Sequence, residues 1–155
     1  MMKRKFGFTL VELLAVVVIV AILTSVAMPQ YRKSIRRAEA TEALVNLRSV
    51  YDSAKRYKSA NSTPPLKLAG LDVEFFDANV SDANTFLIGK FAYTFSNDGV
   101  QACRLNDGGY CFKFYYKHAT HGKDALLCEV QNSSPTGTWL CGSLGTSKSG
   151  SYVLE

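Results

Sequence analysis

Hydrophobic residues follow three different patterns along this chain, and each pattern predicts a different kind of element. The first is a nearly continuous apolar run over residues 8–28, interrupted only by Thr9, Glu12, Thr24 and Ser25. As an α-helix the run would be ~30 Å long, which matches the hydrocarbon core of a bilayer. It therefore predicts a membrane-spanning helix.

The second pattern is an amphipathic continuation of this helix over residues 29–59. Apolar residues recur there at three- and four-residue spacing, which predicts a stripe that docks on a sheet of the same chain. Its members are Ala40, Ala43, Leu44, Leu47, Val50 or Tyr51, Ala54 and Tyr57. Pro29 lacks an amide donor, so we expect a kink or local break there, and the Ser- and Pro-rich residues 59–65 end the helix.

The third pattern has a period of two and begins at Phe91. It predicts strands over residues 91–95, 100–105, 111–117 and 125–131, joined by turns at residues 97–99, 106–108 and 122–124. Residues 66–90 are expected to form a connector with short apolar patches. Together the three patterns predict an α+β fold, with a long N-terminal helix packed on an antiparallel sheet of about four strands.

Cysteines occur only in the C-terminal third, at Cys103, Cys111, Cys128 and Cys141. An even number after a membrane-crossing segment indicates disulfides in an oxidising compartment, and a zinc site is disfavoured because no C-x2-C pair is present. If residues 106–108 form a three-residue hairpin loop with Gly108 left-handed, Cys103 faces Cys111. Cys128 would then pair with Cys141. Three connectivities remain open, and we prefer this sequential one.

Charge adds little to the choice of partner. The 155 residues have a formal net charge of +5, but three of the positive charges, Lys3, Arg4 and Lys5, precede the apolar run. The net charge of the chain after these residues is too small to indicate nucleic-acid binding. A second basic cluster, Arg32, Lys33, Arg36 and Arg37, follows the run. Because both ends are basic, charge does not fix the orientation, whereas the cysteines place the C-terminal part outside the cytoplasm. The second cluster fits a collar on anionic headgroups better than a DNA-binding site.

Glu12 is the residue in the apolar run that needs an explanation. A carboxylate at the centre of a spanning helix costs roughly 2.5–3.5 kcal/mol unless a positive partner is present. The N-terminal segment has basic residues followed, in this order, by Gly7-Phe8, Glu12, an apolar run and Pro29. This order resembles the N-termini of type IV prepilins and of the pseudopilins of type II secretion. The resemblance covers about the first quarter of the chain.

This resemblance implies a fate for each part of the chain. Residues 1–7 would be a leader, which a prepilin peptidase removes between Gly7 and Phe8 before methylating the new amine. Residues 8–28 would first span the inner membrane and later form the core of an extracellular filament of like subunits. An inner-membrane platform and its ATPase would assemble this filament. Glu12 would meet the Phe8 amine of a neighbour. Residues 60–155 would form the periplasmic or extracellular part, whose Cys128–Cys141 disulfide bounds a surface loop.

Several alternatives remain open. An ordinary signal peptide would be cut near Ser25-Val26-Ala27, and a plain anchor would keep Met1. Within the superfamily, we expect a pilin with roles in adhesion, twitching motility or DNA uptake; the alternative is a type II secretion pseudopilin. Pseudopilins with a major role resemble one another in an acidic C-terminal calcium loop, whereas residues 142–155 contain only one acid, Glu155.

No enzyme, metal or cofactor is expected. The four acids between residues 72 and 82 do not follow the calcium-loop pattern, and we interpret His118 and His121 as solvated loop residues.

Overall fold

The computed structural model describes residues 8–75, 77–106, 109–148 and 151–154. Within these residues the chain forms helix α1, strands β1 to β6, helix α2 and strands β7 and β8, in that order. Residues up to Glu39 and residues from Ala40 onward form two compact units, which are described separately below. Helix α1, Leu10–Asn61, contributes to both units because it is continuous across their boundary.

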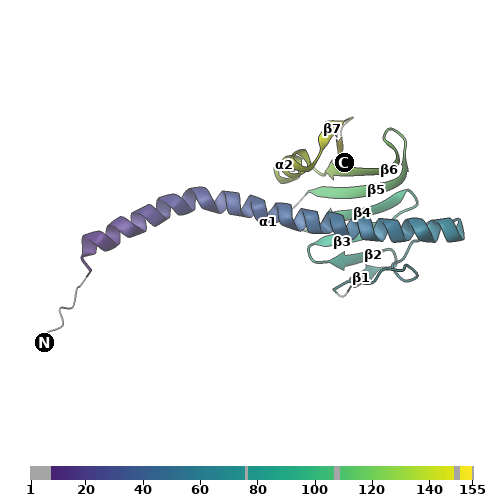
Figure 1. Ribbon diagram of the computed structural model, residues 1–155, viewed down its shortest axis with the longest axis horizontal. Helices are drawn as coiled ribbons and strands as arrows, with labels where there is room; N and C mark the ends of the chain where they lie inside the picture. Colours follow the sequence, from purple (N-terminus) through teal and green to yellow (C-terminus); the bar gives the residue numbers. More distant parts are fainter. Residues whose placement is uncertain (1–7, 76, 107–108, 149–150, 155) are drawn as a thin grey trace. The chain divides into compact units, whose positions relative to one another are not determined.

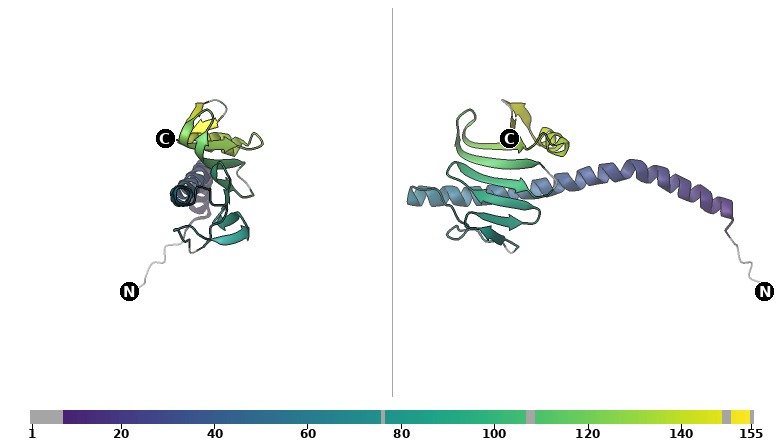
Figure 2. Two further views of the ribbon diagram at one scale, coloured as in Figure 1. Left: turned by 90° about the vertical axis from the view of Figure 1, so that its right-hand side faces the viewer. Right: turned by 180° about the vertical axis from the view of Figure 1, so that it is seen from behind.

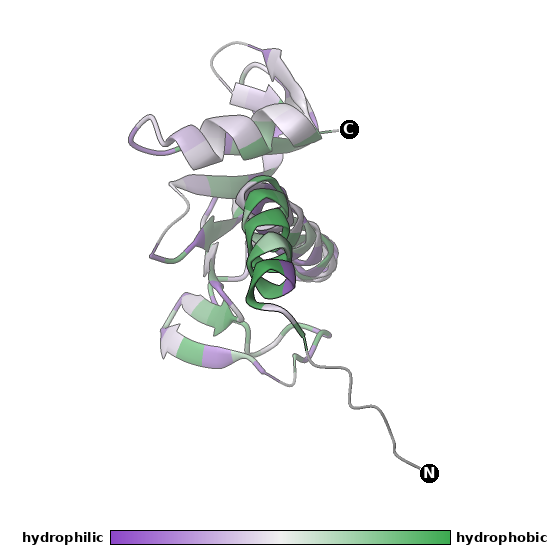
Figure 3. Ribbon diagram, turned by 90° about the vertical axis from the view of Figure 1, so that its left-hand side faces the viewer, coloured by the Kyte–Doolittle hydropathy of each residue, from purple (hydrophilic) through white to green (hydrophobic). Residues whose placement is uncertain are grey.

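In the first unit, α1 has no buried residues over its apolar part. The large apolar side chains from Phe8 to Met28 are 45–87 % exposed. The helix continues through Pro29, so the kink or break expected from the sequence does not interrupt its helical assignment. Figure 3 shows the near end of α1 coloured as hydrophobic. This is the one helix among the described residues that is long and apolar enough to cross a membrane.

The second unit is built on a single antiparallel sheet, whose strands are drawn in Figure 1. Its strands are β1 (Asn79–Asp82), β2 (Thr85–Ile88), β3 (Phe91–Phe95), β4 (Gly99–Arg104), β5 (Tyr110–His118), β6 (Gly122–Val130), β7 (Thr146–Lys148) and β8 (Ser151–Val153). Neighbours in the sheet follow the order β1-β2-β3-β4-β5-β6-β8-β7. Strands β1 to β6 are therefore paired in the order of the sequence, whereas β8 lies between β6 and β7.

One face of the sheet carries the hydrophobic core. Alternate residues of β3, β4 and β5 point to that face, as the buried Phe91, Tyr93 and Phe95 of β3 illustrate. Residues 40–61 of α1 lie over this face of the sheet, as Figures 1 and 2 show, and close this core. The Tyr51 ring stacks on the Phe114 ring with centroids 3.9 Å apart. Burial of one such aromatic side chain contributes ~1.5–3 kcal/mol.

The stripe expected from the sequence is the face of α1 that is buried. Its buried members are Ala40, Ala43, Leu47, Val50, Tyr51 and Ala54. The helix also buries Ser53, which the apolar pattern did not include. Helix spacing thus determines which side of residues 40–54 meets the sheet, and the small residues Ala40, Ala43 and Ala54 are fully or nearly fully buried.

The turn between β3 and β4 is a two-residue loop, Asn97-Asp98. The amide of Ser96 donates to the Gly99 carbonyl at 2.9 Å, and Phe95 lies opposite Val100. Gly99 begins β4 and lies directly against β5, because a Cβ atom there would be 1.9 Å from the Phe114 carbonyl oxygen. Only a glycine fits at this close approach.

Residues 135–154 cover one end of the core. Helix α2, Pro135–Leu144, begins with Ser134 as N-cap, whose hydroxyl accepts from the Gly137 amide at 3.3 Å. Pro135 occupies the first turn, where its missing amide costs no hydrogen bond. Leu140 and Cys141 of α2 are fully buried in the same core as α1.

Several sequence-based expectations about residues 60–155 were wrong in detail, although the α+β class is confirmed. The sheet has eight strands instead of about four, because β1 and β2 lie in the expected connector, and β7 and β8 follow the last strand that was expected. Residues 122–124 begin β6, and the turn lies at residues 119–121. These elements are short or carry few apolar residues, so no periodicity marks them.

Candidate functional site

The first turn of α1 places Thr9 and Glu12 in reciprocal contact. The Thr9 amide and hydroxyl donate to Glu12 Oε2 at 2.9 and 2.8 Å, and the Glu12 amide donates to Thr9 Oγ1 at 3.3 Å. This is a capping box, in which two residues three apart satisfy each other's backbone donors at a helix start. The Thr-x-x-Glu spacing is the sequence signature of this arrangement, although the apolar pattern by itself did not predict it.

The other polar side chains of the apolar run are also satisfied within the helix. Thr24 Oγ1 donates to the Val20 carbonyl and Ser25 Oγ to the Ile22 carbonyl, both at 2.7 Å. A polar group in hydrocarbon is costly unless it is hydrogen-bonded, and these bonds meet that need within one chain. Residues 10–28 therefore present an apolar surface whose hydroxyl groups are already paired.

The expected site residues at this end are only partly described. Phe8 precedes the capping box and is 87 % exposed, and Pro29 lies inside α1 with Arg32, Lys33, Arg36 and Arg37 one to two turns further on. Gly7, the basic residues before it and the expected cleavage junction lie outside the described residues. The structure thus gives the conformation of Glu12, and the processing of Gly7-Phe8 stays a prediction.

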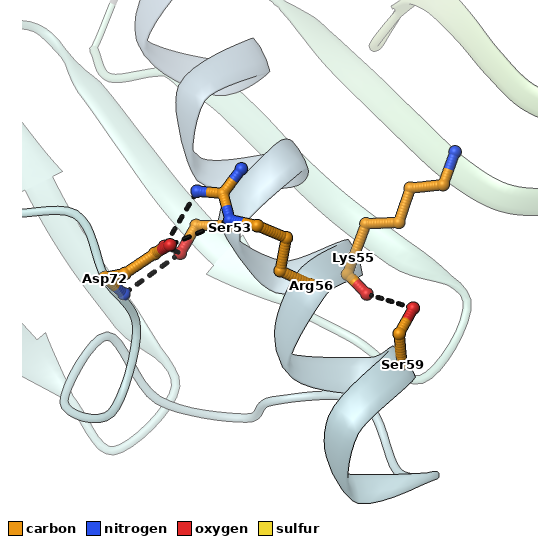
Figure 4. A network of polar contacts seen from close by, with 5 residues as sticks. All are labelled: Ser53, Lys55, Arg56, Ser59 and Asp72. Carbon is orange, nitrogen blue, oxygen red and sulfur yellow. Dashed lines mark hydrogen bonds and ion pairs between the residues drawn. The ribbon is translucent and has the colours of Figure 1, made fainter.

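A polar cluster on α1 anchors the segment that leaves the helix. Figure 4 shows Asp72 of that segment facing Ser53 and Arg56 of α1. Arg56 Nε and Nη2 donate to the two Asp72 oxygens at 2.7 and 2.8 Å, and the buried Ser53 hydroxyl donates to Asp72 Oδ1. The Asp72 amide donates to Ser53 Oγ at 3.2 Å. The Arg56 and Ser53 hydrogen bonds hold the pKa of Asp72 well below its ordinary value.

A second polar contact joins α1 to the start of β6. Tyr51 Oη donates to Asp124 Oδ1 at 2.5 Å, and Lys55 Nζ lies 2.7 Å from the same oxygen. The hydrogen bond from Lys55 has the largest effect on the pKa of Asp124 and lowers it, and the hydrogen bond from Tyr51 lowers it further. The pKa of Tyr51 is strongly raised, mainly because burial disfavours its anion. Both clusters fix residues 51–56 relative to the rest of their unit.

Two disulfides hold the C-terminal region, and their connectivity is the one preferred from the sequence. Cys103 and Cys111 are directly opposite on β4 and β5, with Cα atoms 4.1 Å apart, and Cys128 of β6 is bonded to Cys141 of α2. The expectation for Gly108 in the connecting turn lies outside the described residues. Residues 129–140 therefore form a segment closed by a covalent bond, which is where the sequence resemblance places a surface loop.

The residues considered as metal ligands do not form a metal-binding group among the residues that the structure describes. Within that part of the chain, no three His, Cys, Asp or Glu side chains are arranged to hold a metal ion. Asp72, one of the four acids considered for calcium, is bonded to Arg56 instead. His118 and His121 lie at the β5–β6 turn with ring centroids 4.9 Å apart.

Comparisons with known proteins agree on the nature of the N-terminal segment. A family described as "Prokaryotic N-terminal methylation motif" matches residues 2–28. The Type IV major pilin protein PilA of Myxococcus xanthus is 41 % identical over 56 residues, which are 36 % of this chain and 26 % of that protein. No solved structure matches.

Two further relatives carry different names. A fimbrial protein of Pseudomonas aeruginosa is 31 % identical over 87 residues, 54 % of this chain and 56 % of that protein. The type II secretion system core protein G of Aeromonas hydrophila is 31 % identical over 70 residues, 45 % of this chain and 49 % of that protein. The chain thus spans about half the length, or less, of these curated relatives. With the N-terminal motif and the α+β fold, they support a likeness of this chain to the superfamily of type IV pilins and type II secretion pseudopilins.

Proposed function

We propose that this protein is the structural subunit of a type IV pilus, in which the N-terminal halves of neighbouring helices pack together. The observation that carries the proposal is the apolar length of α1 from Phe8 to Met28, whose large side chains are 45–87 % exposed. An apolar surface of this extent needs a cover of lipid or protein. The bilayer would provide this cover before assembly, and the helices of other subunits would provide it in the filament.

Processing would connect these two states. We infer that residues 1–7 are a leader, that a prepilin peptidase cuts between Gly7 and Phe8, and that the Phe8 amine is then methylated. The new ammonium is the positive partner for Glu12 of a neighbouring subunit. Until then, the capping box with Thr9 gives the Glu12 carboxylate hydrogen-bond donors within its own chain. An inner-membrane platform and an assembly ATPase would drive insertion into the filament.

The remaining segments have corresponding roles in this proposal. Residues 8–28 form the membrane anchor and filament core, residues 29–59 continue the helix, and residues 60–155 lie in the periplasm and then on the filament surface. Both disulfides support this location, because such bonds persist in oxidising compartments. The role is structural, in adhesion or motility, and it involves no catalysis.

A type II secretion pseudopilin is the alternative, and the core protein G relatives favour it. The pilin is preferred because residues 142–155 contain one acid, which is too few for a calcium loop of acidic ligands. Electron microscopy of material sheared from the cell surface tests the choice. A pilin predicts long fibres that contain this chain and vanish when its gene is deleted. Unchanged fibres together with loss of a secreted protein would support the pseudopilin instead.

A further inference from the structure

The tip of the β5–β6 hairpin concentrates positive charge on one face of the sheet. Lys117 of β5 and Lys123 of β6 are directly opposite in the register, and both side chains are exposed. Directly opposite side chains lie on the same face with Cβ atoms about 4.5–5.5 Å apart, and like charges there are destabilising. The hairpin is thus built with a repulsion at its end that a bound anion would relieve.

Carboxylates nearby do not neutralise this lysine pair. Among the described residues, neither Lys117 nor Lys123 has a carboxylate within ion-pair distance. Asp124 is next to Lys123 in the chain, but its Oδ1 already accepts from Lys55 and Tyr51. Glu129, further along the same face of β6, is bonded to Lys113 and Tyr115. Within the described part of the chain, neither ammonium group therefore has an ion-pair partner, and Asp124 attracts Lys123 from a longer distance.

Two imidazoles complete the cluster. His118 Nδ1 accepts hydrogen bonds from the Thr120 and His121 amides, both at 3.2 Å. A neutral imidazole with Nδ1 as acceptor carries its proton on Nε2, so His118 offers a donor there. The His118 ring is held between the Tyr115 and His121 rings, at centroid distances of 4.7 and 4.9 Å. This packing holds the His118 ring at the same end of the hairpin as Lys117 and Lys123.

We propose that the β5–β6 tip, defined by Lys117, His118, His121 and Lys123, binds a multivalent phosphate group. Several phosphate oxygens accept charge-assisted hydrogen bonds at once, which suits two ammonium groups and an imidazole donor better than a single carboxylate does. The site is independent of filament assembly, because it rests only on β5, β6 and their turn. It gives the exposed part of the subunit a partner of defined chemistry, whether a phosphate-bearing polymer or a lipid headgroup.

The test is a titration of the full chain in neutral detergent with inorganic tripolyphosphate, followed by isothermal calorimetry at low ionic strength. We expect Lys117→Gln with Lys123→Gln to weaken binding by at least about tenfold, the loss of two charge-assisted contacts. His121→Gln should weaken it less. The matched control, Lys67→Gln with Lys148→Gln, removes the same charge elsewhere and should change the affinity less than about twofold.

Absence of binding, or equal losses in the two double variants, would overturn the proposal. Thermal unfolding of each variant shows whether it has kept its fold, and the His121→Gln variant provides a second readout if the double variant has not. Displacement of tripolyphosphate by a single-stranded oligonucleotide would support the site and identify a polymer as the source of phosphate. Displacement by phosphatidic acid vesicles would support it and identify a headgroup.

Discussion

The Thr9 amide donates to Glu12 Oε2 at 2.9 Å, and the Glu12 amide donates back to Thr9 Oγ1 at 3.3 Å. This reciprocal contact changes how the Glu12 carboxylate is accommodated in an apolar helix. A carboxylate in an apolar run was expected to need a cation from another subunit, yet it accepts two hydrogen bonds from Thr9 within its own chain. In the proposed filament, Glu12 would then exchange its hydrogen bonds with Thr9 for an ion pair with the Phe8 amine of a neighbouring subunit.

Replacement of Glu12 by glutamine separates these two roles. Glutamine at the third helical position still accepts from the capping residue, but it carries no charge. We expect Glu12→Gln to insert in the membrane as the wild type does and to form at least about tenfold fewer filaments, because the interchain ion pair in a low dielectric is lost. Quantitative immunoblots of membrane and sheared fractions measure both quantities.

Two further variants act as controls for that result. Glu12→Ala removes cap and charge together and should assemble no better than Glu12→Gln. Thr9→Val keeps the charge and weakens the cap, so its filaments should be reduced less. Wild-type amounts of filament from Glu12→Gln would mean that Glu12 acts only as a helix cap.

Removal of the hydroxyl group should have different effects on stability at Tyr51 and at Tyr116. Tyr51→Phe loses the hydrogen bond to Asp124 and should lower the free energy of unfolding by about 1 kcal/mol. Tyr116 Oη is buried without a hydrogen-bond partner among the described residues, and burial raises the pKa of Tyr116 to about 12. Tyr116→Phe should therefore leave stability unchanged or increase it. Denaturant unfolding of the two variants tests this, and equal losses would contradict the hydrogen-bond pattern.

Acid should weaken the cluster of Ser53, Arg56 and Asp72. Because the pKa of Asp72 is lower in the folded chain than its ordinary value near ~3.9, the unfolded chain takes up the proton first as pH falls. The contribution of this carboxylate is therefore complete above pH ~5 and decreases as pH falls below ~4. The difference in unfolding free energy between wild type and Asp72→Asn should shrink over this range. Asp82→Asn, on the exposed strand β1, serves as the control, and a difference that is constant with pH would contradict the assignment.

The two disulfides should contribute unequally to stability. Cys128–Cys141 tethers α2, so replacement of both cysteines by serine should cost about 2–4 kcal/mol. Cys103–Cys111 joins β4 and β5, which the sheet already holds in register, and its loss should cost less. Thermal unfolding of the two double variants gives the order, and non-reducing peptide mapping verifies the pairing. The reverse order would show that α2 is held mainly by its buried side chains.

Much of this fold follows from periodicity in the sequence. The three- and four-residue spacing from Ala40 to Ala54 gives the buried face of α1, and the alternation from Phe91 gives strands β3 to β6. Register follows from turn length, which is why Cys103 lies opposite Cys111. In each case a short local rule and a long apolar pattern point to the same answer.

The parts that sequence patterns did not predict depend on contacts between distant residues. Strand β1 is fully exposed and β7 has three exposed residues, so neither has an apolar alternation to detect. Asp72 was considered among calcium ligands, because nothing local indicates that Arg56 and Ser53 lie beside it. Two local signatures were available and missed: the capping box of Thr9 and Glu12, and the helix start at Ser134-Pro135 that begins α2.

The most direct test of the account is mass spectrometry of the N-terminus of this chain in material sheared from the cell surface. We expect fibres whose subunits begin at Phe8 with a methylated amine, since only cleavage after Gly7 gives Glu12 its proposed interchain partner. A chain that begins at Met1, or at Met28 as after ordinary signal-peptide cleavage, and that is absent from fibres, would contradict it.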